Sequence, residues 1–292
     1  MVISKIIGGL GNQMFQYAAG RAISIGLGEP FKVDIMAFNK YKIHQGYELG
    51  KIFLVNVAEA NKSDISNVLG WRHPQYLRNI LSKKVMVNFR PPGLIVEPHF
   101  HYSSKILDVP SSCYLKGYWQ SENYFSEVSE QIRKDFEFRG SLDGPNYKLV
   151  EAMNKTISVS IHIRRGDYLS NSKASETHTL CSLDYYKSAI GYISERVSNP
   201  YFYIFSDDID WAKSNLNIDF PHQYVEHNQG SNSYNDMRLM SMCKHNIIAN
   251  SSFSWWGGWL NSHMNKIVIA PQNWFSNNFD TRDLLPNSWI RL

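Results

Sequence analysis

Four short apolar runs in the second half of the chain constrain its fold more than any other feature. They are rich in β-branched and aromatic residues, and each has the length of a buried strand. The runs span 157–163, 201–206, 246–250 and 266–270. Helical patterns over 182–197 and 234–245 lie between consecutive runs. Strands that alternate with helices are typical of βαβ units, so the sequence predicts a parallel sheet.

The first half of the chain begins with the same alternation. The pattern predicts a strand over 2–7, a glycine-rich turn over 8–13, a helix over 14–25 and a strand over 31–35. A stretch with the Gly, Pro and Asn of a linker follows at 139–148. A length of 292 residues suits two domains. We therefore expect an α/β protein with two Rossmann-like domains and parallel sheets, one domain over 1–145 and the other over 146–292.

Composition narrows the class of protein. The chain is 43% hydrophobic and 19% charged, as globular proteins are. Its net charge of +4 mildly favours anionic ligands and does not indicate nucleic acid. The three cysteines are far apart and form no Cys/His cluster, which predicts neither a zinc site nor a disulfide framework. With no apolar run of about 18 residues and no signal-peptide core, we expect a soluble, cytoplasmic protein.

Polar clusters follow three of the predicted strands. Residues 164–167 (Arg-Arg-Gly-Asp) follow the first strand, 206–208 (Ser-Asp-Asp) end the second, and 250–256 follow the third. Loops are polar in most proteins, so one such cluster means little. Parallel strands, however, bring their carboxyl ends to one edge, where open sheets bind ligands. Three clusters at equivalent ends favour a shared binding site.

The adjacent arginines indicate what this site binds. Two guanidinium groups repel each other unless an anion lies against them, and a diphosphate meets that need. His162 shares strand parity with Arg164, although a lone histidine is more often structural. The alternative is a solvated loop in which Arg165 pairs with Asp167.

The other two clusters add candidate contacts for a nucleotide. Ser251 and Ser252 stand where a strand passes into a helix, so they can cap it and face an anion. Asp207 or Asp208 can accept hydrogen bonds from the N1–H and N2 edge of guanine. We expect Trp255 and Trp259, one helical turn apart, to pack together.

Two other types of site are partly matched. Asp208 and Asp210 form a DxD pattern of the kind that holds a divalent metal in many sugar transferases. Because arginines are available for the diphosphate, we favour a site without metal. Gly9 and Gly11 followed by Asp34 resemble part of a dinucleotide fingerprint, but Met14 stands at its third small position. An NAD-dependent oxidoreductase therefore stays an alternative.

The chain resembles the bacterial α-1,2-fucosyltransferases over nearly its whole length. The resemblance is carried by GGLGNQMFQYA (8–18), GYWQSENYF (117–125), HIRRGDY (162–168), CSLDYY (181–186), FSDDIDW (205–211) and NIIANSSFSWWGGWLN (246–261). It implies a GT-B fold of two facing Rossmann-like domains. It also implies inverting, metal-independent transfer of L-fucose from GDP-β-L-fucose to the 2-OH of a galactoside, in glycan or O-antigen-type synthesis.

The resemblance also implies roles for individual residues. Arg164 would bind the β-phosphate with His162 beside it, and Asp207 or Asp208 would recognise guanine. The remaining donor contacts would come from Gly11, Asn12, Gln13, Arg165, Ser251, Ser252 and Phe253.

The general base is not determined by these motifs. Asp167 is close to the donor in sequence, yet an aspartate after Arg-Arg-Gly is more often one that orients the arginines. Glu176 and His178, on the loop that follows, are alternatives. A non-catalytic carbohydrate-binding protein would use tryptophans and tyrosines, but it would not need an arginine pair at a strand end.

The acceptor is expected on the N-terminal domain, where a basic stretch stands out. Residues 61–105 contain seven Lys or Arg and two acidic residues. This stretch is either a solvated basic surface or a face that approaches an anionic membrane carrying a lipid-linked, galactose-containing saccharide.

Overall fold

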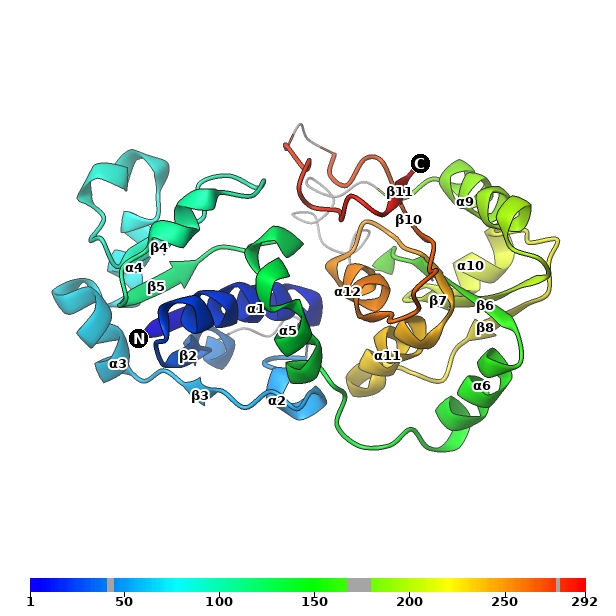
Figure 1. Cartoon of the computed structure of the whole chain (residues 1–292), viewed down its shortest axis with the longest axis horizontal. Coiled ribbons are helices and arrows are strands. Elements are labelled where there is room, and N and C mark those ends of the chain that lie inside the picture. The colour runs from blue at the N-terminus through cyan, green and yellow to red at the C-terminus, as the bar shows by residue number, and fades with distance from the viewer. Residues whose placement is uncertain (41–44, 167–179, 277–278) are drawn as a thin grey trace. The chain divides into compact units, whose positions relative to one another are not determined.

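The computed structural model describes residues 1–40, 45–166, 180–276 and 279–292. Contacts divide these residues into two compact units (Figure 1). Unit 1 comprises Met1–Arg139 and Asp280–Leu284, and unit 2 comprises Gly140–Phe279 and Leu285–Leu292. Each unit has its own parallel sheet, so the α/β class and the parallel sheets are confirmed.

The sheet of unit 1 has the strand order β3-β2-β1-β5-β4. Its strands are β1 (Val2–Lys5), β2 (Phe31–Asp34), β3 (Ala58–Glu59), β4 (Leu94–Val96) and β5 (Cys113–Lys116). The α-helices are α1 (Leu10–Leu27), α2 (Leu49–Ile52), α3 (Lys62–Leu69), α4 (Gln75–Leu81) and α5 (Ser129–Asp135). On one face of the sheet, Ile3 and Tyr114 pack in a hydrophobic core. Leu69 of α3 and Leu81 of α4 belong to the same core.

The turn after β1 is shorter than the sequence predicts. Gly8 makes it, with φ of +84°, a conformation that side chains disfavour. Gly9 then caps α1, which begins at Leu10. Gly11, Asn12 and Gln13 therefore belong to the first helical turn. Helix α1 is tied to β1 by Gln16, whose carbonyl oxygen accepts from Ser4 Oγ and whose Oε1 accepts from the Ile7 amide.

The sheet of unit 2 has the strand order β11-β10-β9-β6-β7-β8, and every pair is parallel. Its strands are β6 (Ile157–Ile163), β7 (Pro200–Ser206), β8 (His222–Val225), β9 (His245–Ile247), β10 (Val268–Ala270) and β11 (Ile290–Arg291). Its α-helices are α6 (Gly144–Asn154), α9 (Leu183–Arg196), α10 (Ile209–Asn215), α11 (Tyr234–Met242) and α12 (Ser252–Leu260). All four strands predicted in this half are present. Strands β8 and β11 were not predicted.

Two local features refine the sequence predictions. The stretch 139–148 is only partly a linker, because α6 begins at Gly144 with Pro145 in its first turn, a position that suits proline. Trp255 and Trp259 are buried on α12 with nearly parallel rings whose centroids are 6.2 Å apart, which confirms that they pack together.

Candidate functional site

Strands β6 and β7 bring two arginines and two aspartates together at their carboxyl ends. Ile163 of β6 lies beside Ser206 of β7, so the residues that follow them continue side by side. Arg164 Nη1 lies 3.1 Å from Asp207 Oδ2, and Arg165 Nε lies 3.5 Å from Asp208 Oδ2. Each guanidinium thus has a carboxylate next to it. This pairing explains how two like charges are held at one strand end before any ligand binds.

Asp207 also holds the backbone of the turn that follows β6. Its two carboxylate oxygens accept hydrogen bonds from the amides of Arg165 (2.8 Å) and Gly166 (3.0 Å). A Cβ at position 166 would lie 3.0 Å from Asp207 Oδ2, so a larger residue there would push the carboxylate by a few tenths of an ångström. The carboxylate therefore fixes the path of the chain that carries both arginines.

Arg165 is packed within unit 2. Its guanidinium carbon lies 3.7 Å from the centroid of the Trp211 ring, a cation–π contact. Asp208, its ionic partner, caps α10 by accepting from the Trp211 amide at 3.3 Å. These contacts hold Arg165 against α10.

His162 is buried beside the arginine pair. Its side chain is 4% exposed, and its ring centroid lies 5.7 Å from that of Phe253 at the start of α12. Nδ1 has no hydrogen-bond partner among the described residues. Burial first and the positive charge of Arg164 second lower the pKa of His162 to about 3, although the negative charge of Asp207 acts against both. The ring is therefore neutral at physiological pH, and it can donate or accept a hydrogen bond without adding a charge to the site.

This low pKa predicts how stability depends on pH. An exposed histidine in the unfolded chain takes up a proton near pH 6.5, whereas folded His162 does not until about pH 3. Its contribution to stability is thus complete above pH 6.5 and is lost as pH falls below it. Relative to His162→Asn, the wild-type free energy of unfolding should fall by ~1.4 kcal/mol per pH unit between pH 6 and pH 4.5. Urea denaturation across this range measures the difference; a constant offset would contradict it.

The residues predicted on the third strand end join the same edge of unit 2. Ser251 caps α12, its Oγ accepting from the Phe253 amide at 3.3 Å, and its own amide donates to the Ala249 carbonyl. Ser252 begins the helix, where amides lack intrahelical acceptors. The contact between His162 and Phe253 joins the start of α12 to the end of β6.

Asp167, Glu176 and His178 lie outside the described residues. Their roles in catalysis therefore stay predictions.

The predicted donor contacts of the first half form a separate group in unit 1. Gln13 is fully buried: its Nε2 donates to the carbonyl oxygens of Gly8 and Gly46, and its Oε1 accepts from the Glu48 amide. Asn12 is partly exposed and accepts from Gln120 Nε2 at 2.6 Å. Gln13 therefore connects the backbone at Gly46 and Glu48 to the first turn of α1.

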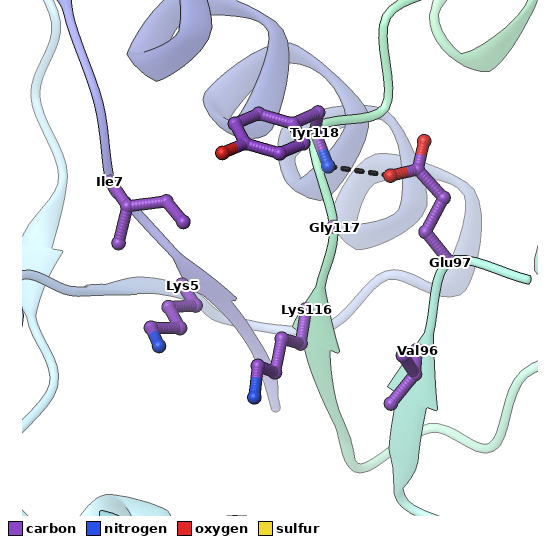
Figure 2. A pocket seen from close by; sticks show the side chains of 7 residues that line it. All are labelled: Lys5, Ile7, Val96, Glu97, Lys116, Gly117 and Tyr118. Atoms are coloured by element: carbon purple, nitrogen blue, oxygen red, sulfur yellow. Dashed lines mark hydrogen bonds between the residues drawn. The ribbon is translucent and has the colours of Figure 1, made fainter. Parts of the chain in front are cut away.

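Unit 1 also has a pocket of about 220 Å³ at the carboxyl edge of its sheet. Strands β2 and β3 extend the sheet on one side of β1, and β5 and β4 extend it on the other, so the order reverses between β1 and β5. Such a switch point is where open parallel sheets bind ligands. The pocket lies there (Figure 2), lined by Lys5, Ile7, Val96, Glu97, Lys116, Gly117 and Tyr118.

Charged groups dominate this pocket. Lys5 and Lys116 extend in the same direction from neighbouring strands (Figure 2). Partial burial, together with repulsion from Lys5 and two arginines, lowers the pKa of Lys116 to about 8. Burial raises the pKa of Glu97 to about 7, although its oxygens accept from the amides of Tyr118 (2.7 Å) and Trp119 (2.9 Å). The pocket thus combines ammonium donors with a carboxylate acceptor.

Asp34 is not available to a dinucleotide. It is 2% exposed, and its Oδ2 accepts from Arg78 Nη1 at 2.6 Å and from the Tyr114 hydroxyl. A ribose has no access to a carboxylate that is buried and paired in this way. The partial match to a dinucleotide fingerprint is therefore coincidental.

Two observations concern ligands and membranes. Among residues outside the gaps at 41–44, 167–179 and 277–278, no group of three His, Cys, Asp or Glu side chains is arranged to hold a metal ion. Within the same ranges, no helix is both long and apolar enough to cross a bilayer.

Sequence comparisons assign the family. Residues 74–292 match the model of glycosyl transferase family 11. The α-1,2-colitosyltransferase of Escherichia coli is 37% identical, with 100% of this chain and 99% of the relative covered. The O-antigen biosynthesis glycosyltransferase WbnK of Escherichia coli is 35% identical, with 99% of each chain covered.

Solved structures agree at the level of the fold. The fucosyltransferase NodZ from Bradyrhizobium superimposes with a TM-score of 0.51 at 12% identity, over 88% of this chain and 91% of NodZ. Arabidopsis thaliana FUT1 gives the same TM-score at 10% identity, over 97% of this chain and 74% of that chain. The resemblance drawn from the sequence motifs is confirmed: the chain belongs to glycosyl transferase family 11.

Proposed function

We propose that this glycosyltransferase moves L-fucose from GDP-β-L-fucose to the 2-OH of a galactoside, with inversion at the anomeric carbon. The observation that carries the proposal is the edge of unit 2, where Arg164 follows β6 and the buried, neutral His162 has an Nδ1 without a hydrogen-bond partner in the described part of the chain. Phosphate oxygens match both groups as acceptors. Relatives named as α-1,2-colitosyl and galactoside α-(1,2)-fucosyl transferases support the type of linkage.

The positive charge of Arg164 indicates how the transfer is catalysed. The bond between the anomeric carbon and the β-phosphate oxygen breaks, and its electron pair leaves with GDP. Arg164 stabilises the negative charge that develops there, more strongly in the transition state than in the bound donor. The acceptor oxygen attacks from the opposite face, so a β-linked donor gives an α-linked product. The hydroxyl proton goes to a general base, for which Asp167 is one candidate beside Glu176 and His178. Because the guanidinium and the start of α12 supply this stabilisation, the reaction needs no metal.

In this proposal Asp208, and not Asp207, recognises guanine. Asp207 already accepts from Arg164 and two backbone amides. The side chain of Asp208 is 34% exposed and can accept from the guanine N1–H and N2 edge.

Unit 1 supplies the acceptor site in this proposal. The pocket of Lys5, Lys116 and Glu97 offers both donors and an acceptor for sugar hydroxyls. Its place at the switch point of the sheet supports this assignment.

The proposal is tested by incubating the purified protein with GDP-fucose and galactose-terminated acceptors, with and without EDTA. We expect GDP release together with an α-1,2-linked product, undiminished by EDTA and identified by NMR. Transfer to another hydroxyl, or none with any galactoside, would contradict it. Colitosyl transfer is the second candidate, favoured by the 37% identical colitosyltransferase. Colitose is L-fucose without its 3-hydroxyl, so GDP-colitose in the same assay distinguishes the two donors.

The acceptor pocket makes its own prediction. Lys116→Met or Lys5→Met should raise the acceptor KM roughly tenfold, the loss expected for one charge-assisted hydrogen bond. The donor KM and the slow hydrolysis of GDP-fucose without acceptor should not change. Lys51→Met, on the exposed surface of α2, serves as the control. An unchanged acceptor KM in both pocket variants would place the acceptor elsewhere.

A further inference from the structure

Unit 1 exposes a cluster of large apolar side chains between α3 and β4. Val85 is 82% exposed, Trp71 70% and Phe89 66%. Tyr76, Ile80 and Val87 are exposed as well. These six residues, here called the 71–89 surface, come from three consecutive short helices: Gly70–Arg72, α4 and Lys84–Phe89. Exposed large apolar side chains on consecutive short helices are typical of an interaction site.

The exposure is not due to a missing core. Helix α4 already buries its inner face, with Arg78 paired to Asp34 and Leu81 packed in the core of unit 1. Tyr76 and Ile80 lie one turn apart on the opposite face. The apolar residues on that outer face therefore have no structural task within the described chain.

The second half of the surface is held in a fixed conformation. Arg90 Nε donates to the Leu81 carbonyl at 2.8 Å, and its Nη2 donates to the carbonyls of Ser82 and Lys83. Met86 packs against the core of unit 1. The segment that carries Val85 and Phe89 is thus anchored at both ends of its turn, and it presents these side chains outward.

The charge of this segment is entirely positive. Residues 65–96 contain no Asp or Glu. Lys83 and Lys84 are exposed, and the Arg72 guanidinium carbon lies 4.5 Å from the centroid of a Trp71 ring. Interleaved aromatic, aliphatic and basic side chains are the composition that binds membrane interfaces, where Trp and Tyr lie at headgroup level and Lys and Arg meet anionic lipids.

We propose that the 71–89 surface docks unit 1 on a bilayer that carries anionic lipids. Val85, Phe89 and Trp71 enter the interfacial layer, and Lys83 and Lys84 bind the headgroups. The positive charge of residues 65–96, which include no Asp or Glu, favours a lipid over a protein partner. A basic stretch of this length complements the extended anionic surface of a bilayer. This inference rests on exposure and charge, and not on the proposed transferase reaction.

The test is co-sedimentation of the full-length protein with vesicles. We expect the protein to pellet with vesicles of phosphatidylcholine and phosphatidylglycerol, and to stay in solution with phosphatidylcholine alone. Raising the salt concentration from about 0.1 M to 1 M should release the protein from the vesicles, because the Debye length falls to about 3 Å and the attraction between lysines and headgroups is screened. Failure to pellet with either vesicle, or equal pelleting with both, would overturn the proposal.

Matched variants locate the surface. Val85→Asp with Phe89→Asp should weaken vesicle binding at least tenfold, and Lys83→Gln with Lys84→Gln about 25-fold. Met264→Asp, at a residue that is 96% exposed in unit 2, and Lys148→Gln with Lys155→Gln should bind as the wild type does. All four proteins should keep wild-type thermal midpoints. Surface variants that pellet like the wild type would assign the binding to another part of the chain.

Discussion

Replacing Arg164 with alanine should lower kcat by at least a hundredfold. Arg164 is the cation at the carboxyl end of β6 whose charge acts on the buried His162, and the proposed leaving group gains its charge there. Removing a preorganised transition-state contact costs about 10²–10³ in rate. Steady-state kinetics with GDP-fucose measure the change.

Two further variants make the Arg164 prediction specific. Arg164→Lys keeps the charge but loses the planar fork, so it should recover only part of the rate. Arg196→Ala, at an exposed arginine near the end of α9, should behave as the wild type does. Near-normal kcat in Arg164→Ala would remove this residue from catalysis.

Asp207→Ala is the second change with a large expected effect. It removes the partner of Arg164 and the acceptor of two amides that shape the turn after β6. We expect kcat to fall roughly a hundredfold. The free energy of unfolding should fall by about 1–3 kcal/mol, because donors lose their acceptor. Turnover and urea denaturation measure the two effects separately.

Asp208→Ala is the comparison for this prediction. It removes the N-cap of α10, which should lower the free energy of unfolding by ~1 kcal/mol. It should also weaken the preference for GDP over inosine diphosphate (IDP), whose base lacks the N2 amino group. If Asp207→Ala instead kept its turnover and lost that preference, Asp207 would be the residue that recognises guanine.

The sequence predicted the central strands of unit 2 well, and the physical reason is their burial. Strand β6 is nearly continuous in apolar character because both faces are covered, and it spans 157–163 as predicted. Strand β8 lies at an edge, where only Val225 is buried, so it carries no apolar signal. In unit 1, β4 has three residues and β5 four, and neither was predicted. The equally short β1 and β2 were predicted because a glycine-rich turn and a helical pattern lie between them.

The candidate site was predicted in its residue types but not in its internal contacts. The pairing of Arg164 with Asp207 follows from the β6–β7 register, which a sequence alone does not supply. Trp211 was missed, although it stands three residues after Asp208, at the spacing of a helix cap. The burial of Gln13 depends on Gly46 and Glu48, far away in the sequence. Lys116, the last residue of β5, and Glu97, which follows β4, were missed because neither strand was predicted.

A crystal structure with GDP tests the central claim most directly. We predict the diphosphate at the carboxyl ends of β6, β7 and β9, with the Arg164 guanidinium on the β-phosphate and a His162 ring nitrogen within hydrogen-bond distance of a phosphate oxygen. A nucleotide bound elsewhere, with the Arg164 guanidinium paired to Asp207 and not in contact with a phosphate, would contradict it.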